Sequence, residues 1–230
     1  MIRIIRVQVA LFSAVSLLAL GASATLSAPI AAAAPAHASK KSKKYKKGKR
    51  KKAVKKVASR KVTGGTETLT FNTQAAQALE KAKVSVAAVS PASGALATGF
   101  VFPLSGGTLN PATGIGSLSA TGGIAFSTSF SVPGLFSSGS EATISEPSLT
   151  LGSTSTLSFT SQQVSPPTFP FATIGLKGAH PVVNGAAITI ANLPVSLTST
   201  GVQFLSGFAA GAFTAGESVG TVTVQVSASS

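Results

Sequence analysis

The sequence lacks the side chains on which most reactive sites depend. Its 230 residues include no cysteine, no tryptophan and no aspartate, and the only acidic residues are five glutamates. Without cysteine the chain can form neither a disulfide bond nor a thiolate metal site. After Val62 there is no arginine, tyrosine or methionine, and one histidine, His180. These absences argue against metal centres and Ser-His-Asp hydrolases, which need clustered His, Cys or Asp.

Positive charge is confined to one part of the chain. The formal net charge is +14, but 14 of the 19 basic residues lie between Lys40 and Lys61. Residues 62–230 hold three lysines against five glutamates, a formal charge of −2. The basic character therefore belongs to a segment and not to a folded surface, which weakens any interpretation as a nucleic-acid-binding domain.

The first 38 residues have the pattern of a signal peptide. Arg3 and Arg6 precede an apolar run over residues 7–20, and small residues come after it. Positive charge, an apolar stretch and a small-residue cleavage site together indicate secretion. We expect cleavage after Ala38, with cleavage after Ala24 as the alternative. Twin arginines are missing, which favours the Sec route over the Tat route.

An uncleaved membrane anchor is the competing interpretation, because apolar and small residues continue to Ala36. The apolar run is short for a membrane span, and Pro29 and Pro35 interrupt the stretch of small residues beyond it. A dense positive run beside an apolar segment normally stays in the cytoplasm, which counts against export. We expect a secreted or cell-envelope protein, because the remaining domain has an extracytoplasmic character.

Residues 39–62 are expected to form a disordered, lysine-rich tether. Like charges repel, so the segment stays solvated and extended. It could be a plain linker, or it could bind anionic cell-envelope polymers or lipid headgroups at about 1 kcal/mol per near-surface charge. Nucleic acid is disfavoured, since Tyr45 is the only aromatic residue within the run. The oligomeric state stays open. The basic residues are Lys40, Lys41, Lys43, Lys44, Lys46, Lys47, Lys49, Arg50, Lys51, Lys52, Lys55, Lys56, Arg60 and Lys61.

Residues 63–230 are expected to form one mainly β domain, an antiparallel β-sandwich or barrel-like fold with one or two short helices. Apolar residues alternate with Ser and Thr, which is typical of sheets with one face on a core and one in water. Repeated short strands separated by Gly and Pro turns favour a sandwich or barrel. The alternating sets are Val84, Val86 and Ala88; Phe100, Phe102 and Leu104; Ile124, Phe126, Phe130 and Val132; Leu157 and Phe159; and Val222, Val224 and Val226.

Turn residues divide these runs at residues 105–107, 110–114, 122–123 and 132–134. The apolar phase shifts between Ile144 and Leu149, with Pro147 at the switch. A bulge at Pro147 would restore the inward face, and an edge position would also tolerate its missing N–H.

Two short helices are predicted, and their sequences are related. Asn72 or Thr73 can cap a helix over residues 74–81, and Thr198 or Ser199 can cap one over residues 201–205. Residues 71–79 align without gaps on residues 197–205, with identity at Gln77/Gln203 and Leu79/Leu205. The alignment is either a chance match or a repeated unit of strand, cap and helix at opposite ends of the domain.

Several short stretches together resemble HtaA-type domains. Residues 99–114 are similar to the family's F-P-x-x-G-G-x-[DN]-P-x-T-G stretch, and residues 116–126 to its next strand pair. Residues 144–149 and 197–221 resemble its later strands, so the likeness spans about residues 66–226. The resemblance implies a mainly β, secreted or surface protein of Gram-positive actinobacteria, from a family that includes haem-binding and haem-transport proteins.

The resemblance does not carry a haem site with it. Haem-binding members use a tyrosine ligand supported by a histidine, but this domain has no tyrosine. The family's G-H-x-G position reads Thr121-Gly122-Gly123 here. His180 is the only candidate cofactor ligand, and a loop histidine before proline is its ordinary interpretation. We therefore expect no cofactor, with haem disfavoured, and no metal.

No catalytic residues are predicted, so the chain is not expected to be an enzyme. Glu141 and Glu146 are five apart and would face opposite sides of a regular strand unless a bulge aligned them. The paired glycines lack the Lys and Ser/Thr of a phosphate loop. Phe204, Phe208 and Phe213 are assigned to the core, with an apolar pocket as the alternative. We expect a non-catalytic binding or display role related to haem or iron uptake; the alternative is a purely structural or adhesive surface protein.

Overall fold

The computed structural model describes residues 58–132 and 136–229, and within these it describes no side chain between residues 130 and 138. All described residues belong to the compact unit Ala53–Ser230. The expected signal peptide and the basic residues from Lys40 to Lys56 lie outside the described residues. The elements are β1 (Arg60–Phe71), α1 (Thr73–Lys81), β2 (Val84–Val89), β3 (Ser93–Ala95), β4 (Gly99–Leu109), β5 (Gly116–Ala120), β6 (Gly123–Val132), β7 (Phe136–Leu151), β8 (Thr156–Thr160), β9 (Thr168–Ile174), β10 (Val182–Asn184), β11 (Ala187–Leu197), α2 (Ser199–Ser206) and β12 (Ser218–Ala228).

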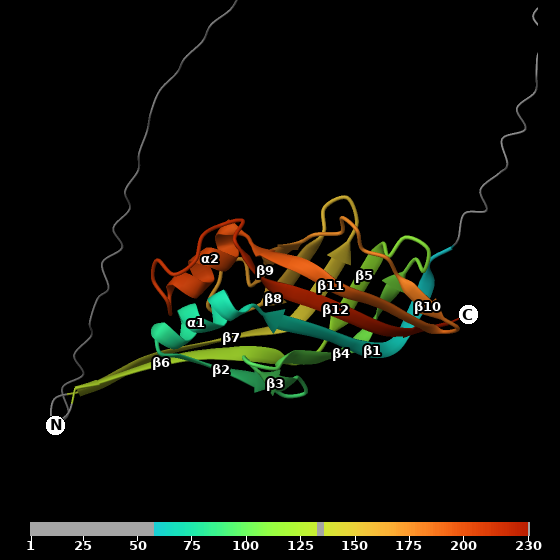
Figure 1. Cartoon of the computed structure of the whole chain (residues 1–230). Helices are drawn as coiled ribbons and strands as arrows, with labels where there is room; N and C mark the ends of the chain where they lie inside the picture. Colours follow the sequence, from blue (N-terminus) through green and yellow to red (C-terminus); the bar gives the residue numbers. More distant parts are fainter. Residues whose placement is uncertain (1–57, 133–135, 230) are drawn as a thin grey trace, which may run out of the picture. The chain divides into compact units, whose positions relative to one another are not determined.

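The strands close into a barrel-like ring. They pair in the order β1, β12, β11, β9, β8, β7, β5 and β4, and β4 pairs back to β1. Each of these pairings is antiparallel, and Figure 1 shows the ring from the side. The mainly β, antiparallel prediction is confirmed. Closure gives each of these eight strands a partner on both sides, which protects most of the sheet from pairing with other chains.

The alternating apolar residues fill the interior. Phe100, Phe102, Leu157 and Phe159 are fully buried, as are the inward residues of β12. Phe159 makes edge-to-face ring contacts with Phe102 and Phe171, at centroid distances of 6.1 and 5.6 Å. Such contacts stabilise a packed aromatic core beyond the burial of area alone. Phe130 and Val132 lie outside the described side chains.

β7 has different partners along its length, and a bulge separates its two parts. Its first part pairs with β6 up to Ser145, and its last part pairs with β5 from Ser148. Between them the register to β8 shifts, and Glu146 has a φ of 52°. Ile144 and Leu149 are both buried. The predicted bulge at Pro147 is confirmed: the extra residue returns the apolar side chains to the interior.

The glycines at 106 and 107 do not form the turn that their sequence predicts. They lie inside β4, where the register to β5 shifts between Leu104 and Gly106. Gly107 has a φ of 134°, and a Cβ there would lie 2.2 Å from the Ser117 carbonyl oxygen. Glycine is needed here because the neighbouring strand approaches the backbone closely. The turns at residues 110–114 and 122–123 are present as predicted.

Both predicted helices are present, and their caps match. Asn72 caps α1 by accepting a hydrogen bond from the Ala75 amide at 2.8 Å, and Thr198 caps α2 by accepting from the Gly201 amide at 3.0 Å. Each cap residue comes directly after a strand, β1 or β11. The aligned segments thus share one local structure. The two helices lie at the same end of the barrel and not at opposite ends (Figure 1).

Asn72→Ala is expected to lower the free energy of unfolding by about 1 kcal/mol, the usual cost of losing an N-cap. Asn72 also donates from Nδ2 to the Ser218 carbonyl at 2.7 Å, so the loss loosens α1 from β12. Chemical denaturation of the variant measures the effect. Thr73→Ala is the matched control, because its exposed side chain caps nothing; equal losses in both variants would contradict the cap assignment.

The sheet begins before the expected domain boundary. Arg60 and Lys61 pair with Leu109 and Thr108 of β4, and Val62 is buried in the core. The last residues of the segment assigned to the tether therefore form the start of β1.

Candidate functional site

The best candidate site is at the end of the barrel that carries the helices. Residues 207–213, which come after α2, run back toward α1. Two grooves open on this segment, and Phe208 lines both. Phe208 is half-buried, so part of its ring faces each opening.

Four phenylalanine rings pack against one another at the grooves. The Phe208 ring lies 5.7 Å from that of Phe204 and 5.9 Å from that of Phe126. Phe204 in turn lies 5.5 Å from Phe126 and 5.8 Å from Phe169. Three of these rings are buried, and Phe208 is their outermost member. The core assignment of Phe204 and Phe213 is confirmed, and Phe208 serves as a groove wall.

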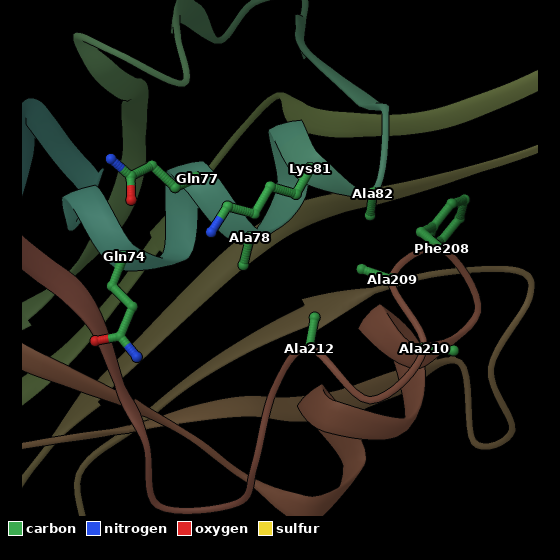
Figure 2. A pocket seen from close by; sticks show the side chains of 9 residues that line it. All are labelled: Gln74, Gln77, Ala78, Lys81, Ala82, Phe208, Ala209, Ala210 and Ala212. Carbon is green, nitrogen blue, oxygen red and sulfur yellow. The ribbon is translucent and has the colours of Figure 1, made fainter.

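The first groove lies between α1 and the 208–212 segment and has a volume of about 450 Å³. Most of the residues that line it are alanines, whose small side chains leave the groove open. Gln74, Gln77 and Lys81 line it on the α1 side (Figure 2). Gln74 also donates to Glu217 at 3.3 Å, and Glu217 accepts from the Thr214 amide at 2.9 Å. No acidic side chain pairs with Lys81 among the described residues. The first groove therefore combines a small apolar floor with a free cation at its rim.

The second groove has a volume of about 480 Å³ and lies on the other side of Phe208. Phe204, Phe208 and Val164 give it an apolar wall, and Gln163, Gln203 and Glu141 give it a polar one. Both volumes fall in the range of small-molecule sites, which are usually apolar clefts with a few polar groups.

Glu67 is a buried acid that was not among the residues singled out from the sequence. It lies in β1 opposite Val224 of β12 and Phe102 of β4, and its side chain is fully buried. Neither carboxyl oxygen has a hydrogen-bond partner within the described part of the chain. Burial raises the pKa of Glu67 to about 8. At neutral pH the carboxyl group of Glu67 is therefore mainly uncharged in the folded protein.

A signal for Glu67 was present in the sequence. Glu67 alternates with Thr66 and Thr68 in phase with Leu69 and Phe71, so the period-2 pattern directs it inward with them. No local sequence pattern predicts the grooves at the helical end, because α1 and the 208–212 segment are far apart in the chain.

His180, the sequence's only cofactor-ligand candidate, lies exposed in the loop between β9 and β10. It lines neither groove. Glu141 and Glu146 are both exposed on β7, and Glu80 is exposed on α1. In residues 58–132 and 136–229, no three His, Asp or Glu side chains gather to hold a metal ion. None of the described helices is long and apolar enough to cross a membrane.

The HtaA family model matches residues 80–225, more than half of the chain. This chain belongs to the HtaA family. Its fold is also similar to that of solved proteins. The C-terminal domain of HtaA from Corynebacterium glutamicum has a TM-score of 0.53 at 15% identity, covering 74% of this chain and 99% of that one. The heme-binding protein HtaB of the same organism has a TM-score of 0.47 at 15% identity, covering 75% and 96%. No curated protein matches the chain significantly.

The grooves of this HtaA-family domain do not fit haem held by an iron–protein bond. Haem iron is bound in proteins by His, Cys, Met or Tyr. None of these residue types lines either groove, and the one histidine of the domain is the exposed His180. The Phe208 ring, the alanine floor and Lys81 can instead contact the face and the carboxylates of a flat ligand.

Proposed function

We propose that this protein is an exported, non-catalytic binding domain of the haem- and iron-uptake type, and that it holds a flat apolar ligand beside Phe208. The observation that carries the proposal is the half-exposed Phe208 ring with an open groove on each side. The family relation supports a tetrapyrrole as the ligand class. Because no His, Cys, Met or Tyr lines the grooves, the proposed binding is by contact with the ring and without a bond to iron.

The chemistry of the two grooves supports binding over catalysis. Acid–base catalysis needs a positioned pair of titratable groups. The second groove contains Glu141 without a titratable partner in its lining, and the first contains Lys81 alone. Glutamine amides at both rims can orient a ligand by hydrogen bonds, but they cannot exchange protons with it.

The proposed location is the cell envelope. The N-terminal charge, apolar run and small residues support export. The lysine-rich segment supports retention on anionic envelope polymers or headgroups, an attraction that salt weakens. A domain held in this way could display its helical end to ligands outside the cell.

Titration with hemin and with metal-free protoporphyrin tests the binding mode. We expect both to bind with the same dissociation constant, because none of the usual haem ligands His, Cys, Met and Tyr lines either groove. Absorbance monitors hemin, and porphyrin fluorescence monitors the metal-free ring. Tighter binding of hemin with a red-shifted Soret band would contradict this mode. Binding of neither ring would favour the alternative of a structural or adhesive surface protein.

Phe208→Ala is expected to weaken binding of either ring about tenfold, since it removes the aromatic surface common to both grooves. Ser206→Ala is the matched control: Ser206 is the exposed last residue of α2, two residues before Phe208, and lines neither groove. Equal affinities of wild type, control and Phe208→Ala would place the ligand elsewhere.

A further inference from the structure

The first part of β7 has a paired neighbour on one side only. Residues 139–144 pair with β6 without a break in register, and β8 pairs with β7 only from Ser145 onward. β8 ends at Thr160, which pairs with Ser145, so it does not reach the earlier residues of β7. Among residues 58–132 and 136–229, no other strand pairs with this stretch. One edge of residues 139–144 is therefore open in the described chain, and we call it the β7 edge.

Every second residue of this stretch directs its backbone groups away from β6. The amide of Glu146 donates to the carbonyl of Gly122, the residue before β6, at 2.9 Å. Residues that exchange hydrogen bonds alternate along an antiparallel pair, so the even-numbered residues of β7 are the ones bonded to β6. A Cβ on Gly123 would lie 2.4 Å from the carbonyl oxygen of Ile144, so this even-numbered residue also points its carbonyl toward β6. The N–H and C=O groups that point to the β7 edge are those of Gly139, Glu141 and Thr143, and no strand of the described chain pairs with them.

The second groove runs along the β7 edge. Residues 140–142 line it, together with the loop after β8 and with α2. Ala142 is buried and lies opposite Phe126 of β6, whose ring is 5.9 Å from that of Phe208. Opposed residues of adjacent strands face the same side of a sheet. A strand added at the β7 edge would therefore place one side chain beside Ala142, against the phenylalanine rings, and the next one on the outer face beside Glu141.

We propose that the β7 edge binds an extended segment of a partner protein as an added strand, antiparallel to β7 and in line with β8. The outward N–H and C=O groups at every second residue match the backbone of such a strand, whose side chains alternate between the groove and solvent. Of the described residues that line the second groove, Glu141 alone is charged. The segment therefore carries Lys or Arg opposite Glu141 and an apolar residue opposite Ala142. This partner is additional to the flat ligand proposed above, because the first groove stays open on the other side of Phe208.

A second copy of this chain fits the β7 edge less well. Pairing of two copies through the edge would supply Glu141 instead of a basic residue, since residues 139–144 include no Lys or Arg. Like charges on opposed residues of adjacent strands destabilise the pair. The edge therefore suits a different protein, and the oligomeric state of the chain checks this choice.

Binding of a synthetic peptide to the full chain tests the proposal. The probe is fluorescein-labelled Ser-Thr-Val-Lys-Val-Thr-Ser amide, and fluorescence polarisation without porphyrin makes the result independent of the proposed ligand. In the antiparallel pair the lysine N–H faces β7 and the valine N–H faces solvent. We expect N-methylation of the lysine amide to weaken binding about tenfold, and N-methylation of a valine amide to change it by less than about twofold. Absence of saturable binding, or equal effects of the two methyl groups, would overturn the proposal.

Two variants of the chain locate the binding at the β7 edge. Thr143→Pro removes one outward N–H while the bonds to β6 remain, so we expect the peptide to bind about tenfold more weakly. Glu141→Lys is expected to weaken the lysine peptide about threefold and to strengthen a peptide with Glu in place of Lys, whereas Glu80→Lys, on exposed α1, changes neither. Circular dichroism checks that each variant is folded. Unchanged binding by both edge variants would contradict the proposal. A wild-type dimer that Thr143→Pro dissociates would also contradict it, because the edge would then belong to a second copy.

Discussion

Glu67→Met is expected to raise the free energy of unfolding at pH 8 by about 3–5 kcal/mol. The carboxyl group is fully buried between β4 and β12 and has no hydrogen-bond partner in the described chain. Methionine has a similar length and no group that needs a partner, so it removes the burial penalty without leaving a cavity.

The stability of the wild type is expected to fall with rising pH, because burial raises the pKa of Glu67 from 4.5 to about 8. Below pH 4.5 the group is protonated in both states, and no stability is lost. Between pH 4.5 and 8 the unfolded chain releases the proton that the fold retains, so each pH unit shifts the folding equilibrium about tenfold toward the unfolded state. Above pH 8 the dependence ends.

Denaturation midpoints from pH 4 to pH 9 measure this dependence in the wild type and in three variants. Glu67→Gln is expected to flatten the profile while keeping an unpaired polar group, and Glu67→Met to flatten it at higher stability. Glu80→Gln, an exposed glutamate, is the control and should match the wild type within about 0.5 kcal/mol. A wild-type profile parallel to that of Glu67→Gln would show that Glu67 is ionised or solvated in the fold.

Local signals in the sequence predicted most of the elements. Period-2 alternation set the inward faces of β4, β8 and β12, because strand side chains alternate whatever partner the strand finds. Asn72 and Thr198 marked both helix starts, since a cap acts within one turn. Pro147 marked the bulge, because the apolar phase before and after it could not share one regular strand.

Non-local pairing explains what the sequence did not predict. Closure of the ring depends on Thr66 to Leu69 meeting Phe100 to Pro103, and no local pattern distinguishes that pairing from an open sandwich. Gly106 and Gly107 looked like a turn because paired glycines are typical of turns, and their own sequence does not show how closely β5 approaches them. The grooves form where α1 and the 208–212 segment meet, more than 120 residues apart. From the sequence alone, Phe208 could therefore be assigned to the core or to a pocket. Its place between two grooves could not be predicted.

Gly201→Ala is expected to lower the free energy of unfolding by about 2–3 kcal/mol and the melting temperature by roughly 5–10 °C. A Cβ at this position would lie 2.1 Å from the Phe171 carbonyl oxygen, and that oxygen also accepts a hydrogen bond from the Thr198 amide at 3.1 Å. Since the obstacle is backbone, α2 must move away from β9. Phe204 and Phe208 would move with it, so we also expect weaker porphyrin binding.

Comparison of the two capped helices shows why the effect of Gly201→Ala should be local. Ala75 holds the position in α1 that Gly201 holds in α2, and its methyl group is accommodated there, so the constraint comes from the packing against β9 and not from the cap. Gly207→Ala is the matched control, because Gly207 has a helical φ of −64° and a Cβ would meet only the Phe204 carbonyl oxygen, at 3.3 Å. It should change the melting temperature much less than Gly201→Ala does, because its contact with backbone is longer by more than 1 Å. Gly201→Ala could instead melt at the same temperature as this control and bind porphyrin as tightly as the wild type. That result would contradict the close packing of α2 on β9, and with it the position of Phe208 between the grooves.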